Sequence, residues 1–198
     1  MVKGRALFPR MAPPDPEGLP TETRELLEAC RARSGLPQTP FIYGVLAVHP
    51  ALLSRLVGAG LGRMPDALLA PADRELLVLR TLRNCGGEYE WTHHVRQAPG
   101  RGLDTDGVRL ARDGAHDDGS REALLVLAAD DLHSEHTLSA QTWQRLEKHL
   151  SHAEILELVV LVGFIRVFAL VGNALCLPLE PCMQERVDRP WPVEVKPE

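Results

Sequence analysis

The residues with the clearest capacity for chemistry lie in one short segment, residues 88–94, whose sequence is Glu-Tyr-Glu-Trp-Thr-His-His. On an α-helix, Glu90 and His94 are four residues apart and share a face, and His93, three residues from Glu90, can also meet it. A carboxylate beside an imidazole raises the pKa of the ring and fixes its tautomer, which suits a general base or acid near neutral pH. A positioned proton-transfer group of this kind contributes about 10²–10⁴-fold in rate. Glu75 can join the pair if its own helix folds back as a hairpin.

The same residue types have other interpretations. A glutamate and a histidine four residues apart are often only a surface pair worth about 0.3–0.5 kcal/mol, and acids at a helix start are favoured by the helix dipole. Glu90 and His93 also form an E-x-x-H, the spacing found in di-metal carboxylate bundles. Such a site needs a second E-x-x-H and two further glutamates. The nearest partner, Asp130 with His133, leaves the set incomplete, so we predict no metal site.

The elements that must position these groups are helices. Apolar residues follow helical spacing over 71–84, a double glycine at Gly86 and Gly87 breaks the pattern, and a second helix is predicted over 88–98. Pro99 and Gly100 end this helix early and reshape one wall of any site beside it. Further helices are predicted over 21–33, 41–49, 50–61, 104–112, 120–132, 139–150 and 153–175, after a proline-rich arm over 1–20. No segment has a comparable strand pattern, so the fold class is all-α, a helical bundle.

Composition excludes several classes of protein. The chain has 198 residues and a net charge of -5, without the concentrated basic face of a nucleic-acid binder. Its four cysteines form no C-x-x-C and suit the reduced thiols of a cytoplasmic protein. The most apolar tract, 155–179, is interrupted by Glu157, Arg166 and Asn173, which favours a buried core helix over a membrane span. We therefore expect no nucleic-acid or membrane partner.

One run of sequence resembles a known family. Residues 84–95, Asn-Cys-Gly-Gly-Glu-Tyr-Glu-Trp-Thr-His-His-Val, preceded by Arg-Glu-Leu at 74–76, resemble the carboxymuconolactone decarboxylase family, within the alkylhydroperoxidase D-like fold. The stretches 129–133, 157–164, 173–175 and 178–180 fit the same family. The resemblance covers residues 40–182 and suggests three parts: an arm and first helix over 1–38, the alkylhydroperoxidase D-like domain over 39–182, and a tail over 183–198.

The resemblance also implies a homo-oligomer, a trimer or hexamer, with sites near subunit contacts. The peroxidase branch of this fold carries a glutamate, a C-x-x-C and then a histidine. Aligning that histidine with His94 places the glutamate at Glu75 and the two cysteines at Gly87 and Glu90. Thiol–disulfide chemistry needs an attacking and a resolving thiolate, and neither residue supplies one. Cys85 has no cysteine three residues on. The chain is therefore not expected to be a thiol peroxidase.

The branch that remains works without cysteines and without a cofactor, by proton transfer on a small carboxylated lactone. By this resemblance, the catalytic residues are Glu75, Glu90 and His94. Tyr89, His93 and His133 are the substrate contacts. The predicted function is a cofactor-free lyase or decarboxylase acting on a small carboxylated or lactone-type substrate. Two alternatives stay open: a metal-dependent enzyme built on the E-x-x-H, and a non-catalytic, oligomeric binding member of the family.

Overall fold

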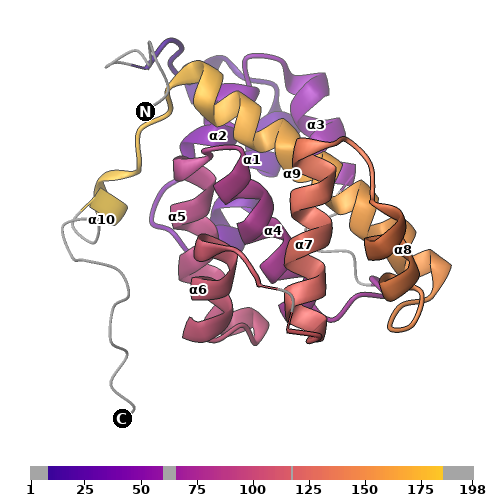
Figure 1. Cartoon of the computed structure of the whole chain (residues 1–198). Coiled ribbons are helices and arrows are strands. Elements are labelled where there is room, and N and C mark those ends of the chain that lie inside the picture. Colours follow the sequence, from indigo (N-terminus) through magenta and orange to yellow (C-terminus); the bar gives the residue numbers. More distant parts are fainter. Residues whose placement is uncertain (1–8, 60–65, 117, 185–198) are drawn as a thin grey trace. The chain divides into compact units, whose positions relative to one another are not determined.

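The computed structural model describes residues 9–59, 66–116 and 118–184, and every regular element in this part of the chain is a helix (Figure 1). The predicted all-α fold class is confirmed. The described residues group into two compact units. Unit 1 lies within Met1–Ala59 and Leu175–Glu198, and unit 2 lies within Gly60–Ala174.

Unit 1 contains the N-terminal helices and the C-terminal turn. Its elements are η1 (Pro16–Gly18), α1 (Thr21–Ser34), α2 (Phe41–Leu46), α3 (Pro50–Ala59) and α10 (Pro181–Gln184). Helix α1 packs against both α2 and α3. The fully buried Glu180 accepts a 2.7 Å hydrogen bond at Oε1 from the backbone N–H of Phe41, at the start of α2. This bond satisfies one of the donors that a helix start leaves open.

Unit 2 is organised around one helix. Its elements are α4 (Pro71–Asn84), α5 (Glu88–Gln97), η3 (Pro99–Arg101), α6 (Thr105–Asp113), α7 (Arg121–Ser134), α8 (Ala140–Leu146) and α9 (His152–Leu175). Helix α4 packs against α5, α6 and α7, and Figure 1 shows it between α5 and α7. Because α4 is covered on several sides, Leu76, Leu77, Leu79 and Leu82 are all buried.

The corner between α4 and α5 depends on two glycines. Gly86 adopts φ 60°, the left-handed conformation that favours glycine after a helix, and Gly87 N–H returns to the Leu82 carbonyl at 2.8 Å. A Cβ on Gly87 would lie 3.2 Å from the Ala169 Cβ, so α9 passes closely over this corner. Asn173 on α9 donates a 2.9 Å hydrogen bond to the Cys85 carbonyl. The double glycine thus permits both the turn and the close approach of α9.

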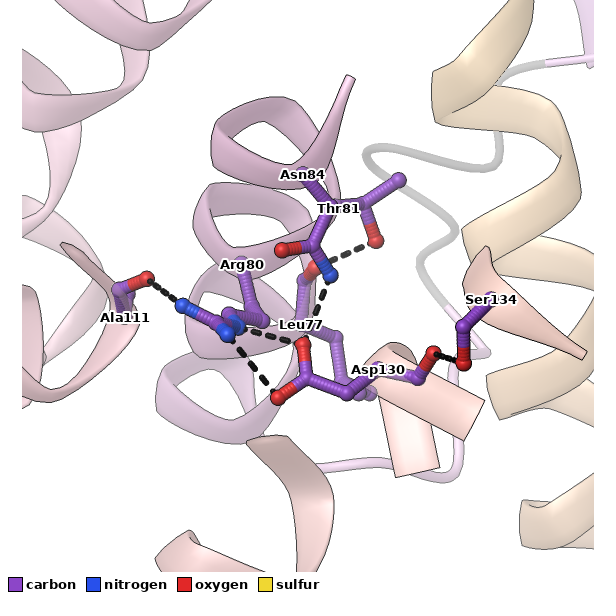
Figure 2. Close-up of polar contacts among 7 residues, drawn as sticks. All are labelled: Leu77, Arg80, Thr81, Asn84, Ala111, Asp130 and Ser134. Atoms are coloured by element: carbon purple, nitrogen blue, oxygen red, sulfur yellow. Dashed lines mark hydrogen bonds and ion pairs between the residues drawn. The ribbon is translucent and has the colours of Figure 1, made fainter. Parts of the chain in front are cut away.

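A partly buried ion pair holds α4 to its neighbours (Figure 2). Arg80 on α4 donates to both carboxylate oxygens of Asp130 on α7, at 2.6 and 2.9 Å, and to the Ala111 carbonyl of α6 at 3.2 Å. Asn84 donates to the same carboxylate at 2.7 Å. Bidentate guanidinium–carboxylate pairs are among the stronger polar contacts in proteins, so this network fixes α6 and α7 relative to α4.

The predicted helix ends agree with the structure in most places. Ser120 and Ser139 cap α7 and α8, each accepting a 3.1 Å hydrogen bond from the backbone N–H three residues on. Helix α2 ends at Leu46 and α8 at Leu146, earlier than the predicted 49 and 150. In both places turns continue the chain, and Leu150 is still buried. Apolar spacing therefore marked the buried side of these segments correctly but overstated the length of the helix. The predicted end at 61 lies outside the described residues.

Helix α9 is 24 residues long and very apolar, yet one side of it is exposed. Ile155, Leu158, Leu161 and Ile165 are buried, as predicted for a core helix. The opposite stripe is exposed and apolar, with Leu156 at 65% and Leu170 at 64%. Among the described helices α9 alone has the length and hydropathy of a membrane span, and 39% of its most apolar stretch is buried. A core helix of a soluble protein can have these properties too.

Candidate active site

The candidate site is built on a carboxylate in the interior of unit 2. Glu75 lies in the second turn of α4 and is fully buried, with 0% of its surface exposed. Its Oε1 lies 2.8 Å from Nδ1 of His94 on α5, and its Oε2 accepts a hydrogen bond from Nη1 of Arg101 at the end of η3. The hairpin predicted from the sequence is therefore present, and it joins two of the three predicted catalytic residues.

The charges around Glu75 determine its ionisation. Burial raises the pKa of the Glu75 carboxyl, but the His94 ring and the Arg101 guanidinium outweigh burial and hold this pKa below its usual value. Glu75 is therefore ionised near neutral pH and can only accept hydrogen bonds. It follows that His94 Nδ1 carries the proton in this contact. In the neutral ring, Nε2 then has the free electron pair.

Arg101 is the site residue that sequence reasoning missed. Helix α5 ends at Gln97, one residue before the predicted end, and the chain turns through η3 to Gly102, whose φ is 79°. This turn returns Arg101 to the site, where its Nη2 also donates a 2.8 Å hydrogen bond to the Gln97 side chain. The early stop at Pro99 was predicted, but not that it would bring a cation to Glu75. The signal that could have pointed to Arg101 is electrostatic, because a buried carboxylate such as Glu75 requires partners that compensate its charge.

The remaining residues of the predicted set are not among the groups that bond Glu75. Glu90 is partly buried one turn before His94, and it is not one of the groups that Glu75 bonds. Tyr89 and His93 are buried, with ring centroids 4.7 Å apart. Tyr89 also faces Gly172 of α9, so its ring belongs to the packing between α5 and α9. Their roles in catalysis and substrate binding stay predictions.

His133 lies in the last turn of α7, in a second polar cluster. Burial lowers the pKa of the His133 ring, and the positive charge of Arg166 lowers it further, so the ring is neutral near pH 7. Arg166 donates a 3.1 Å hydrogen bond to the Leu132 carbonyl, and its positive charge also acts on the Cys85 thiol. Burial outweighs Arg166 and raises the pKa of this thiol. Cys85 is therefore protonated at neutral pH, whereas a reactive cysteine is a thiolate.

The alternative metal site is not assembled in the described residues. Asp130 of the D-x-x-H is bonded to Arg80 and Asn84, as described above. Within residues 9–59, 66–116 and 118–184, no three histidine, cysteine or acidic side chains are grouped as ligands for an ion. The two sequence motifs on α5 and α7 therefore do not converge on one centre in this chain.

The position that aligns with the first redox cysteine of the peroxidase branch is confined. A Cβ at Gly87 would lie 3.2 Å from the Ala169 Cβ and 3.3 Å from Leu82 Cδ2, tighter than ordinary contacts. A side chain at this position would therefore require α9 or Leu82 to move. The absence of a thiol at Gly87 agrees with the local packing.

A pocket of about 320 Å³ is present in unit 1, and none of the residues that line it belongs to the candidate site. Its walls are mainly apolar and rich in proline, and include Pro13, Pro14, Pro16, Leu27, Phe41 and Pro181. It contains no acidic, basic or histidine side chain. This pocket therefore has none of the groups needed for proton transfer.

Comparison with known proteins relates the chain to others by fold. No family model matches the sequence, and no curated protein matches it. An uncharacterized peroxidase-related protein with an alkylhydroperoxidase AhpD core, from Ralstonia eutropha JMP134, aligns with a TM-score of 0.76 and 15% identity over 90% of this chain and 95% of its own. An uncharacterized peroxidase-related protein from Silicibacter sp. TM1040 aligns with a TM-score of 0.74 and 14% identity, over 92% of this chain and 97% of its own.

The debrominase Bmp8 is a third structure with this fold. Its apo form aligns with a TM-score of 0.71 and 13% identity, over 92% of this chain and 98% of its own. A cysteine-to-alanine variant of Bmp8 is known in complex with 2,3,4-tribromopyrrole. At such low identity these likenesses show the fold alone. They confirm the predicted alkylhydroperoxidase D-like fold, while membership of the carboxymuconolactone decarboxylase branch stays a prediction.

Proposed function

We propose that this protein is a cofactor-free lyase of the decarboxylase type, which moves a proton on a small carboxylated or lactone-type substrate. His94 is the group that meets the substrate. The observation that carries the proposal is the contact between His94 Nδ1 and the fully buried Glu75 carboxylate. A buried acid that orients an imidazole leaves the far nitrogen of the ring as a positioned base, which is the arrangement that general acid–base catalysis requires.

The proton balance of the reaction follows from this arrangement. In a lactone rearrangement, Nε2 of His94 takes a proton from carbon, the ring becomes an imidazolium, and the proton is returned at another position. In a decarboxylation, Nε2 of the neutral ring first takes up a proton from solvent. The bond from carbon to the carboxylate then breaks, CO₂ leaves, and the electron pair left on carbon takes this proton from the imidazolium. Ionised Glu75 stabilises the charged ring in both cases. No external oxidant or reductant is needed.

Glu75 acts through His94 in this proposal. Both of its carboxylate oxygens are already bonded, one to His94 and one to Arg101, and none of its surface is exposed. Nε2 of His94 takes part in no hydrogen bond within the described residues. It is the nitrogen left for a substrate. Glu90 remains a proposed catalytic residue, and Tyr89, His93 and His133 remain the proposed substrate contacts.

The test is turnover of carboxylated lactones, beginning with carboxymuconolactone, by the wild-type chain and by His94→Ala. We expect the variant to lose about 10²–10⁴-fold in rate while its helical content stays unchanged. Thr92→Ala is the matched control, because Thr92 lies on the same helix and bonds only the Glu88 carbonyl one turn before it. Equal rates for His94→Ala and the wild type would refute the assignment.

We also propose that the chain works as a homo-oligomer, a trimer or hexamer. The supporting observation is the exposed apolar stripe of α9, which includes Leu156, Val160, Val167 and Leu170. Contiguous apolar surface on a protein marks sites of association. A second copy of the chain is the partner proposed for this stripe.

A further inference from the structure

The buried Glu75 carboxylate is held by two side chains, a histidine and an arginine, from two different elements. His94 approaches Oε1 from α5, and Arg101 approaches Oε2 from η3. Arg101 is itself held, because its second terminal nitrogen bonds the Gln97 side chain at 2.8 Å. The Arg101 side chain is only 19% exposed, so solvent screens its interaction with Glu75 less than it would on the surface.

We propose that Arg101 is a positioning residue for His94. It occupies one oxygen of Glu75 and balances the charge of the carboxylate, so that the other oxygen takes the Nδ1 proton of His94 and Nε2 stays the basic atom of the ring. The geometry of the three side chains carries this inference. Its consequence for catalysis rests on the proposed function.

The charge of the buried Glu75 carboxylate explains why Arg101 is needed beside His94. An ionised carboxylate buried without a partner is very costly, and it would take up a proton to become neutral. A neutral Glu75 could donate a hydrogen bond to His94, and the ring would then carry its proton on Nε2, which is the wrong tautomer for a base. With Arg101 in place, the carboxylate is balanced even when His94 is neutral. His94 can therefore gain and lose a proton while Glu75 stays ionised.

Other charges near α4 are held in pairs of their own and do not replace Arg101. From α5 and η3 the groups that act on Glu75 are His94 and Arg101. Helices α7 and α9 present charges to α4 that are paired there with other residues, and α6 contributes a backbone carbonyl. These contacts are Arg121 with Asp73, Asp130 with Arg80, Glu157 with Arg74, and the Ala111 carbonyl with Arg80.

The test is an NMR titration of the full chain, which needs no substrate. The carboxyl carbon of Glu75 is followed against pH in the wild type, Arg101→Gln and Arg101→Lys, and is assigned by its absence from Glu75→Gln. We expect Arg101→Gln to raise the pKa of Glu75 by about 1–3 units and Arg101→Lys, which keeps the charge, to restore most of the difference. Arg109→Gln is the control, because Arg109 lies in an exposed pair with Asp106, and it should leave Glu75 unchanged.

Nitrogen NMR of the His94 ring provides a second reading on the wild type alone, which stands even if Arg101→Gln fails to fold. We expect the neutral His94 ring of the wild type to carry its proton on Nδ1. In Arg101→Gln, we expect the ring to shift towards the tautomer that carries the proton on Nε2. An Nε2–H tautomer in the wild type, or a Glu75 titration that Arg101→Gln does not move, would overturn the inference. If these expectations hold but the wild type converts no carboxylated lactone, the positioning role stands and the proposed function fails.

Discussion

Nδ1 of His94 lies 2.8 Å from Oε1 of Glu75, although the two residues are 19 positions apart in sequence and lie on different helices. The turn at Gly86 and Gly87 makes the contact possible by folding α5 back along α4. Because Glu75 is fully buried and ionised, the contact defines both the protonation and the direction of the ring. In the neutral ring, the proton therefore lies on Nδ1, which faces Glu75, and the free electron pair lies on Nε2.

Stability should depend on pH through Glu75. Its folded pKa is lowered, so its contribution is complete above the unfolded value of about 4.3 and is lost as pH falls below that value through the folded one. At pH 7, Glu75→Gln should lower the free energy of unfolding by about 3–5 kcal/mol, because Arg101 is left without its charge partner. The difference in the free energy of unfolding between the wild type and Glu75→Gln should become smaller as pH falls below about 4.3.

Urea unfolding from pH 7 to pH 3 measures this difference. A gap that stays constant over this range would contradict the assigned ionisation, and Asp106→Asn, in an exposed pair, is the control.

Gly87→Ala should destabilise the protein through contact with α9. The new methyl group would lie 3.2 Å from the Ala169 Cβ, and overpacking of this kind costs about 1–3 kcal/mol. Removing the opposing methyl in Gly87→Ala/Ala169→Gly should cost less than the sum of the two single changes. Thermal unfolding of the four proteins in the cycle measures the coupling.

Gly58→Ala is the matched control for that cycle, because nothing lies within 4 Å of a Cβ added at Gly58 on α3. It should not destabilise the protein, since alanine is the better helix former. Purely additive effects at Gly87 and Ala169 would show that the two positions do not press against each other.

The Arg80–Asp130 pair should be a stabilising contact. Asp130→Asn keeps the shape of the side chain but removes the charge that accepts bonds from Arg80 and Asn84. Hydrogen bonds to charged groups contribute about 1.5–3 kcal/mol, and Asp130 is about one-third exposed, so we expect the lower end of this range in urea unfolding. Asp113→Asn is the control, since its pair with Arg112 lies at the surface. Equal effects of the two substitutions would contradict a structural role for Asp130.

The exposed stripe of α9 should hold the copies of the chain together. Leu156→Glu/Leu170→Glu places two charges on this stripe and should lower the mass measured by light scattering from that of a trimer or hexamer to that of a monomer. Val48→Glu is the control, because Val48 is 53% exposed on unit 1, and it should leave the mass unchanged. A wild type that is already monomeric would remove the proposed interface.

The sequence allowed the hairpin that brings Glu75 to His94 to be predicted, because helical spacing and the Gly86–Gly87 break are local signals. Arg101 could not be predicted in the same way. Its approach to Glu75 depends on the path of the chain through Pro99 and Gly102, and a short turn of this kind has no periodicity that reveals its direction. The separation of His133 from Glu75 was hidden for a similar reason. Its place is set by how α7 packs against α4, which depends on long-range contacts such as that of Arg80 with Asp130.

The central claim, that His94 moves a proton on a carboxylated substrate, is tested most directly by deuterium incorporation. Carboxymuconolactone is incubated in D₂O with the wild type, His94→Ala or Thr92→Ala, and the product is followed by proton NMR and mass spectrometry. We predict one solvent deuteron at the reacting carbon with the wild type and Thr92→Ala, and a loss of about 10²–10⁴-fold in its rate of appearance with His94→Ala. Incorporation by His94→Ala at the wild-type rate, or no incorporation by the wild type above the enzyme-free rate, would contradict the claim.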